Sequence, residues 1–445
     1  MIEFLTTLLM PAALGALLGT LVGLLPGIGP AATMALLLPM TFTWPAESAL
    51  IVLCAVYFGA QYGSSTTAIL LNLPGEASGV VTAEQGHRMA LDGRGGVALV
   101  VAASASLLAG LGTAALIAWT TPVLARVSLA LGPLQIGLLI VLAAAAVVVA
   151  GQGGALRNTA MLVLGALIGL IGADFGGGVP RLTMGLAELR DGVGMVPLIV
   201  GLFGVGEVLA TWSGRDRSST LAPIGRFWPD RAEWRHSTPA ALRGSLVGAV
   251  VGMLPGGSTL LAALGSQFIE RRLLRGDAAW QRGHVAGVAG PEAANNASAQ
   301  TGLIPLIGLG IPPNPAMAIL LGALLLHGVP PGMAMFEQHT ALFTHLVWGI
   351  VLANLVLLVL NVPLVGLWLH VLRVPMQVLM PLILMLSLIG VYAHQRAVFD
   401  VWLMLLFGLL GLALRRAGFG LAPIVFGAVL APLFEDHFRR YLMLL

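Results

Sequence analysis

GALLGTLVGLLPGIG occupies residues 15–29, and GSLVGAVVGMLPGGS occupies residues 244–258. In each stretch three glycines stand four residues apart and a Pro-Gly pair follows, so the two stretches match at a constant offset. Glycines at this spacing by themselves indicate only that helices pack closely in a membrane. The Pro-Gly pairs interrupt both helices at matching positions, and this favours an internal duplication over chance helix packing.

The composition is that of a membrane protein. Hydrophobic residues form 58% of the chain, charged residues form 9%, and the mean hydropathy is +0.95. A soluble protein carries roughly 25% charged residues, so this chain has too few to cover a soluble surface. Apolar segments of about twenty residues can cross a bilayer as helices. The 58 glycines suit packed helices better than a membrane barrel.

We therefore predict an all-α, polytopic transmembrane helical protein with two homologous halves and broken or re-entrant helices. Roughly ten to thirteen membrane elements are expected. The predicted organisation is a first transmembrane repeat at 1–212, a basic cytoplasmic linker at 213–243 and a second transmembrane repeat at 244–445. The chain start lacks the basic region of a signal peptide, so the first apolar segment is expected to remain as a span. The single Cys54 excludes an intramolecular disulfide and a cysteine-clustered metal site.

Two arginine-rich stretches flank the second glycine stretch. Residues 213–243 and 270–282 both carry several arginines, and the positive-inside rule places both in the cytoplasm. The apolar segment 241–268 between them is too short for two full crossings of about twenty residues each. A re-entrant hairpin with its tip at Pro255 would put both flanks on one side. Broken backbone of this kind is tolerated where it is enclosed by protein or lines a wet cavity.

A second pair of motifs follows the two glycine stretches. The first consists of a polar run at 59–67, an apolar run and a proline break at 72–76. The second consists of a polar run at 291–300, an apolar run and a proline break at 310–314. Interrupted segments at corresponding positions of two halves are the sequence pattern of a transporter's midplane binding site.

A carboxylate that crosses a membrane needs hydrogen-bond donors that replace water. Residues 64–67 supply four hydroxyls just before an apolar run, as helix N-caps do, and the N-termini of half-helices add partial positive charge. Asn295 and Asn296 supply amides from the other half. The predicted substrate-binding residues are Pro26, Gly27, Gly63, Ser64, Ser65, Thr66, Thr67, Asn72, Pro255, Gly256, Gly257, Ser258, Thr259, Glu292, Asn295, Asn296 and Gln300.

The unwound carbonyls at the two proline breaks could hold a hard cation such as Na⁺, as broken transporter helices do. The predicted ion-binding residues are Asn72, Pro74, Gly75, Gly310, Pro312 and Asn314. The coupling ion is expected to be Na⁺ or H⁺. No catalytic residue, metal site or organic cofactor is predicted.

Each of these residue types also has a purely structural interpretation. Serine and threonine in membrane helices often bond back to a carbonyl of their own helix, and asparagines can simply join two helices. Glu292 opens a long, otherwise uncharged stretch, and an ionisable residue within a membrane indicates function by default. The alternative for Glu292 is a structural pair with a nearby arginine.

Three stretches carry a resemblance to a known family. They are GLLPGIGPAATMALLLPMTF (23–42), YGSSTTAILLNLPGEASGVVTAEQG (62–86) and the segment 252–328, which contains PEAANNA. With these motifs the chain resembles the large membrane subunit (TctA) of the tripartite tricarboxylate transporters over almost its whole length. Ser64 and Pro313 stand where the family usually has glycine. Proline cannot take a left-handed turn, so the details of the second break stay open.

The resemblance implies a large permease subunit in the bacterial inner membrane. It would import tricarboxylates or related carboxylates by alternating access, driven by a cation gradient and without ATP. The implied partners are a small membrane subunit of about four spans and a periplasmic solute-binding protein. The resemblance does not name the carboxylate, the coupling ion or the oligomeric state.

Two other classes of function are alternatives to a carrier. An intramembrane enzyme needs a nucleophile with its base, a carboxylate dyad or a metal set, and the sequence shows no HExxH, no G-x-S-x-G and no P-loop. We therefore predict that the protein is not an enzyme. A membrane channel or a non-transport scaffold is the remaining alternative. Saturable uptake that follows a cation gradient would separate a carrier from a channel.

Overall fold

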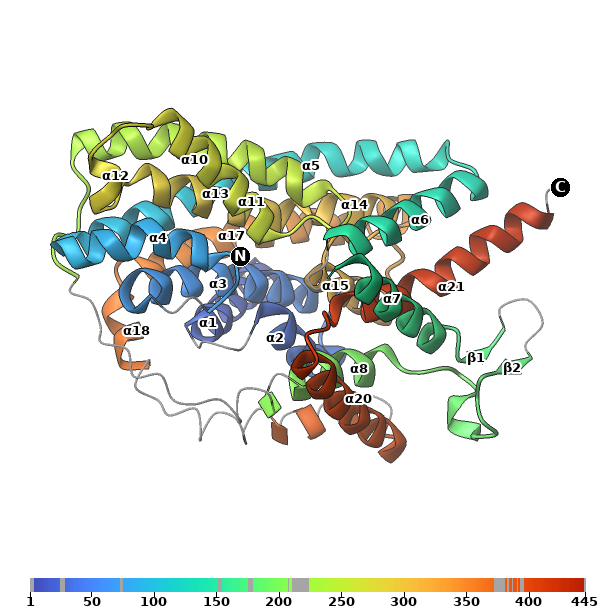
Figure 1. Cartoon of the computed structure of the whole chain (residues 1–445). Coiled ribbons are helices and arrows are strands. Elements are labelled where there is room, and N and C mark those ends of the chain that lie inside the picture. Colours follow the sequence, from blue (N-terminus) through green and yellow to red (C-terminus); the bar gives the residue numbers. More distant parts are fainter. Residues whose placement is uncertain are drawn as a thin grey trace.

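The computed structural model describes residues 4–24, 29–72, 75–150, 154–174, 179–206, 208–209, 224–371, 381, 384–385, 387–389, 391–392 and 396–443. These residues are almost entirely helical, and the prediction of an all-α, polytopic membrane protein is confirmed. Figure 1 shows α5, α10, α11 and α13 along one side of the molecule, with α8 and α20 on the opposite side. One antiparallel pair of short strands, β1 (Gly172–Ala173) and β2 (Pro180–Arg181), follows α7.

The helices before residue 210 are η1 (Phe4–Leu9), α1 (Met10–Gly23), α2 (Pro30–Leu37), η2 (Leu38–Thr43), α3 (Ala46–Leu71), α4 (Gly79–Met89), η3 (Ala90–Arg94), α5 (Gly95–Leu129), α6 (Pro133–Ala150), α7 (Ala155–Gly169), η4 (Ala187–Leu189), α8 (Met195–Ile199) and η5 (Val200–Val205). Those after residue 224 are α10 (Arg231–Met253), α11 (Thr259–Leu273), α12 (Ala279–Arg282), α13 (Ala286–Thr301), α14 (Leu303–Leu309), α15 (Pro315–Leu326), α16 (Met333–Gln338), α17 (Thr340–Asn361), α18 (Val365–Val371), α20 (Val398–Arg416) and α21 (Ala422–Met443).

Five helical segments of the described chain are long and apolar enough to cross a membrane, and five shorter apolar helices accompany them. The long segments differ in how far protein encloses them. The most apolar part of α3 is 100% buried, whereas that of α20 is 28% buried. Along α20, Trp402, Leu406 and Leu409 are exposed at the spacing of one helix face. We therefore assign α3 to the centre of the protein and this face of α20 to the lipid.

The first glycine stretch brings α1 against α3. A Cβ atom added to Gly15, Gly19 or Gly23 would lie 2.2–2.5 Å from a backbone carbonyl oxygen of α3, where no side chain fits. The carbonyls belong to every fourth residue of α3, namely Val52, Val56 and Ala60. The glycines therefore allow the two backbones to touch, as small residues do between membrane helices.

The second glycine stretch makes the same contacts between α10 and α13. A Cβ atom on Gly244, Gly248 or Gly252 would lie 2.1–2.4 Å from a backbone carbonyl oxygen of α13. These carbonyls again belong to every fourth residue, namely Gly290, Ala294 and Ser298. Twelve residues beyond the last contact, each half ends a helix in the left-handed region, at Asn72 (φ 55°) and Gly310 (φ 71°). One local arrangement thus recurs twice in the chain.

The Pro-Gly break after the second glycine stretch, at residues 254–258, is the tip of an antiparallel hairpin. A capping box between Asp230 and Glu233 starts α10, and the chain turns at residues 254–258 before α11 begins. Arg243 on α10 donates two hydrogen bonds to Glu270 on α11, at 2.8 and 2.7 Å. Both basic flanks therefore lie at the same end of the hairpin. The predicted linker boundary at residue 243 falls inside the continuous helix α10.

The corresponding break of the first half follows α1. Pro26 and Gly27, which were predicted to lie at this break, are outside the described residues, as is Pro74 of the next break. The chain resumes at Gly29, and α2 begins at Pro30 with a proline in its first turn, where the missing amide costs nothing.

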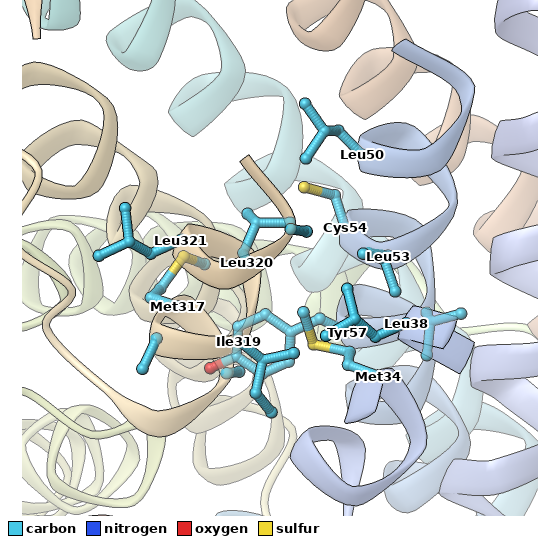
Figure 2. Close-up of a cluster of buried hydrophobic side chains, with 14 of the residues drawn as sticks. Met34, Leu38, Leu50, Leu53, Cys54, Tyr57, Met317, Ile319, Leu320 and Leu321 are labelled. Carbon is cyan, nitrogen blue, oxygen red and sulfur yellow. The ribbon is translucent and has the colours of Figure 1, made fainter. Parts of the chain in front are cut away.

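A cluster of buried apolar side chains joins the two halves (Figure 2). Met34 and Leu38 come from α2 and η2, and Leu53 and Tyr57 come from α3. They pack against α15, whose labelled residues are Met317, Ile319, Leu320 and Leu321. Helix α3 of the first half is thus fixed beside α15 of the second, which directly follows the proline break at 310–314.

The glycine contacts predict a selective loss of stability. Gly248→Ala should destabilise the protein by about 1–3 kcal/mol, because the added Cβ forces α10 away from the carbonyl of Ala294. The matched control is Gly112→Ala in the middle of α5, where nothing lies within 4 Å of the added Cβ. Thermal unfolding in detergent measures both variants. Equal melting temperatures for the two would contradict the proposed close contact.

The hairpin predicts the sidedness of its flanks. Single cysteines placed at the exposed residues Arg235 and Arg271, in a Cys54→Ser background, should react with an impermeant thiol reagent from the same side of the membrane. The reason is that α10 and α11 run antiparallel to a tip that does not cross. Reaction from opposite sides would show that the segment is a simple span.

Candidate functional site

A cavity of about 470 Å³ lies where the breaks of the two halves meet. One part of its wall is the tip of the α10–α11 hairpin, residues 256–261. A second part is the break 313–315, and a third is Glu76 with Ala77 from the first half. The remaining wall is mostly apolar and comes from α6, η5 and the junction of α20 with α21, where Arg415 adds a guanidinium. A pocket of this size lies within the usual range for small-molecule sites, about 300–1,000 Å³.

Two helix N-termini border this cavity. Ser258 caps α11 by accepting a hydrogen bond from the amide of Leu261 at 3.2 Å. Asn314 caps α15 by accepting one from the amide of Met317 at 3.0 Å. The amide of Gly256 donates a hydrogen bond to the carbonyl of Pro313 at 3.0 Å, which connects the hairpin tip with the break at 310–314. Helix N-termini carry partial positive charge, and with Arg415 they make a wall suited to an anion.

A second polar cluster surrounds Glu292, which is fully buried in α13. Ser65 of α3 donates to Oε2 of Glu292 at 2.6 Å, and Thr82 of α4 donates to Oε1. Asn296, one turn further along α13, donates to Ser106 of α5 at 2.7 Å. The alternative of an arginine partner finds no support in the described residues, because Arg243 on the adjoining α10 is bound to Glu270.

A short path of contacts connects this cluster with the cavity. Ser65 bonds Glu292, and its neighbour Ser64 accepts a hydrogen bond from the amide of Glu76 at 2.9 Å. The carboxyl of Glu76 in turn accepts one from Ser78 at 3.0 Å. Glu76 lines the cavity. Two adjacent serines of α3 thus contact the carboxyl group of Glu292 and the backbone amide of Glu76.

The interpretation of residues 64–67 as N-cap donors is wrong. Helix α3 continues without a break from Ala46 to Leu71, so these hydroxyls lie inside the helix, towards its C-terminal end. The hydroxyls of Ser65 and Thr67 reach the carbonyls of Gln61 and Ser64 in the same helix, which satisfies them without ending it. Gly63 packs against the backbone of α1, and Thr66 lines a small void beside Ser65.

The remaining predicted residues fall into three places. Gly256, Gly257, Ser258, Thr259 and Asn314 line the cavity. Asn295 and Asn296 are buried in α13. Gln300 does not line the cavity and instead connects α13 with two other helices. It accepts a hydrogen bond from Thr113 of α5 at 3.0 Å and donates one to Asn354 of α17 at 3.1 Å.

The predicted ion-binding residues are divided between the two breaks. Asn72 and Gly310 end their helices in the left-handed conformation. Gly75 lies against the carbonyl of Gly23, where a Cβ would come within 2.1 Å. Pro312 is buried. The binding of an ion by these residues stays a prediction. Pro255, which is one of the predicted substrate-binding residues, forms the turn before Gly256.

Four polar residues of these two clusters were not among the predicted site residues. They are Glu76, Thr82, Ser106 and Arg415. Glu76 is the last residue of the proline break at 72–76, and this position could have identified it. Arg415 lies in the last turn of an apolar helix, where an arginine ordinarily indicates a membrane boundary. Thr82 and Ser106 are single hydroxyls that only the packing of α4 and α5 brings to Glu292.

Comparisons with known proteins identify a family and two relatives of this chain. The family model described as the tripartite tricarboxylate transporter TctA family matches residues 9–426. An uncharacterized 52.8 kDa protein in the TAR-I ttuC' 3'region of Agrobacterium vitis is 43% identical over 421 residues, which cover 94% of this chain and 83% of the relative. An uncharacterized protein in the TAR-II ttuC' 3'region of the same organism is 43% identical over 201 residues, covering 44% and 81% respectively. No solved structure matches the chain.

Proposed function

This chain belongs to the tripartite tricarboxylate transporter TctA family, and we propose that it is the large permease subunit of a binding-protein-dependent secondary transporter. It imports tricarboxylates or related carboxylates across the bacterial inner membrane, driven by a gradient of Na⁺ or H⁺. Its proposed partners are a small membrane subunit and a periplasmic solute-binding protein that delivers the carboxylate. It carries its substrate without a cofactor and without chemical conversion.

The observation that carries this proposal is the wall of the 470 Å³ cavity. A carboxylate in this cavity meets the N-termini of α11 and α15 and the guanidinium of Arg415. Burial of a carboxylate is costly unless charges or donors replace its water. These groups supply both, and guanidinium pairs well with carboxylate oxygens. No fixed metal is needed for such a site to bind its substrate and release it.

The repeated contacts support a mechanism of alternating access. We propose that the chain consists of two homologous halves, because the glycine contacts and the left-handed helix ends recur at matching positions. Residues of the two breaks in the second half border the cavity together with Glu76 of the first half. Rocking of one half against the other would open the cavity first to one side and then to the other, as in other transporters built from repeats.

The decisive experiment is uptake into proteoliposomes that contain this chain with its small partner subunit. Radiolabelled citrate and other carboxylates are supplied with and without the binding protein and an inward cation gradient. We expect saturable uptake that needs both. The variant Arg415→Gln should weaken the apparent affinity by about 10- to 100-fold, the usual effect of removing a charged hydrogen-bond partner.

The matched control is Arg416→Gln, because Arg416 is exposed beside Arg415 and does not line the cavity. It should leave the affinity unchanged. Equal effects of the two variants would remove Arg415 from the site. Uptake that never saturates and ignores the gradient would favour a channel and overturn the proposal.

A further inference from the structure

Glu292 lies at the junction of four helices. Its backbone belongs to α13, and its carboxyl oxygens contact Ser65 of α3 and Thr82 of α4. Ser106 of α5 is linked to it through Asn296, whose amide donates both to Ser106 and to the carbonyl of Glu292. Burial of an isolated carboxylate in such an interior costs free energy, and this cost favours the neutral acid over the charged form.

The hydroxyl of Ser65 has a partner for either form of the carboxyl. It lies 2.6 Å from Oε2 of Glu292 and 3.0 Å from the carbonyl oxygen of Gln61. A serine hydroxyl has one hydrogen and can also accept. When Glu292 is charged, Ser65 donates to Oε2. When Oε2 carries a proton, that proton is donated to Ser65, whose own hydrogen turns to Gln61. In both forms Thr82 donates to Oε1.

The distance between the Ser65 hydroxyl oxygen and Oε2 of Glu292 suits a shared proton better than a metal ion. Ca²⁺, and Na⁺ of similar size, binds oxygen ligands at about 2.3–2.6 Å. Two ligands at right angles around such an ion are therefore about 3.4 Å apart. The oxygens of Ser65 and Glu292 are 2.6 Å apart. This is the distance of a hydrogen bond between a hydroxyl and a carboxylate.

A water-sized void adjoins the same hydroxyls. It has a volume of about 10 Å³, and its lining includes Tyr62, Ser65, Ser106 and Asn361. A void of about 10–15 Å³ holds one water molecule when polar groups surround it. A water here could pass a proton to Ser65 and from there to Oε2 of Glu292.

The other titratable groups around Glu292 have partners of their own or act through charge. On α10 and α11, Arg243 and Glu270 form a salt bridge. On α4, Glu84 accepts a hydrogen bond from Gln267. Tyr62 on α3 and Glu76 after α3 both interact electrostatically with Glu292. The described part of α5 that faces Glu292 contributes Ser106 and no charged residue.

We propose that Glu292 is a proton-binding site, and that its protonation is coupled to transport. One proton from water adds to Oε2, so that the carboxylate of charge −1 becomes a neutral acid, and the same proton leaves from Oε2. The coupling rests on the proposed transport function. Its path runs through the adjacent Ser64 and Ser65 to Glu76 in the cavity wall.

Infrared difference spectroscopy of the purified protein in lipid nanodiscs tests the site without substrate or partners. Titration of pH in wild-type protein should give a carbonyl band of a protonated carboxyl group that disappears as the pH rises. Glu292→Gln should lose that band. Any decrease of the band in Glu76→Gln measures the part of its intensity that comes from Glu76. The control Glu84→Gln should retain the band. Ser65→Ala should shift the midpoint of its titration, which gives a second readout should Glu292→Gln fail to fold.

The proposal is overturned if folded Glu292→Gln retains the whole band, or if the band responds to Na⁺ at constant pH and not to pH itself. In proteoliposomes, an inward proton gradient should accelerate uptake by wild-type protein and by the control Glu84→Gln, and not by Glu292→Gln. Acceleration retained in that variant would contradict the coupling. Failure of uptake in every variant, with the band intact, would instead count against the transport function.

Discussion

The structure depends on the direct contact of helix backbones along the two glycine stretches. Because Gly15, Gly19 and Gly23 have no side chain, α1 lies on the carbonyls of α3, and α10 lies on α13 in the same way. The contacts hold α10 as far as Gly252. The chain breaks directly afterwards, at residues 254–258, and the N-terminus of α11 borders the cavity there.

Enclosure by protein explains how so much polarity is held within the membrane. The central helix α3 is buried on every side, and its hydroxyls, like the carboxyl of Glu292, find partners in neighbouring helices. Lipid offers no such partners. The apolar outer surface is formed by helices such as α20, whose exposed face carries large hydrophobic side chains. The polar clusters can therefore be built from hydroxyls and helix ends, which bind an anion or a proton reversibly.

Much of this arrangement could be predicted from the sequence, because breaks and small residues are local signals. The glycine spacing, the breaks at Pro255 and Pro312, and the position of Glu292 in an otherwise uncharged stretch were all visible. The hydroxyls at 64–67 were misplaced because a serine before an apolar run resembles an N-cap, whereas enclosure lets α3 continue through them. Arg415 and Thr82 could not be found, since only tertiary packing brings them to the cavity and to Glu292.

Protection of the hairpin tip from a thiol reagent tests the central claim most directly, namely that a carboxylate occupies the cavity at the broken helix ends. Ser258→Cys in a Cys54→Ser background places one reactive thiol in the cavity wall, and Leu273→Cys at the exposed far end of α11 is the control. The account predicts that citrate, or another carboxylate that is taken up, slows alkylation at residue 258 and leaves residue 273 unaffected. Equal rates at residue 258 with and without a transported carboxylate would contradict it.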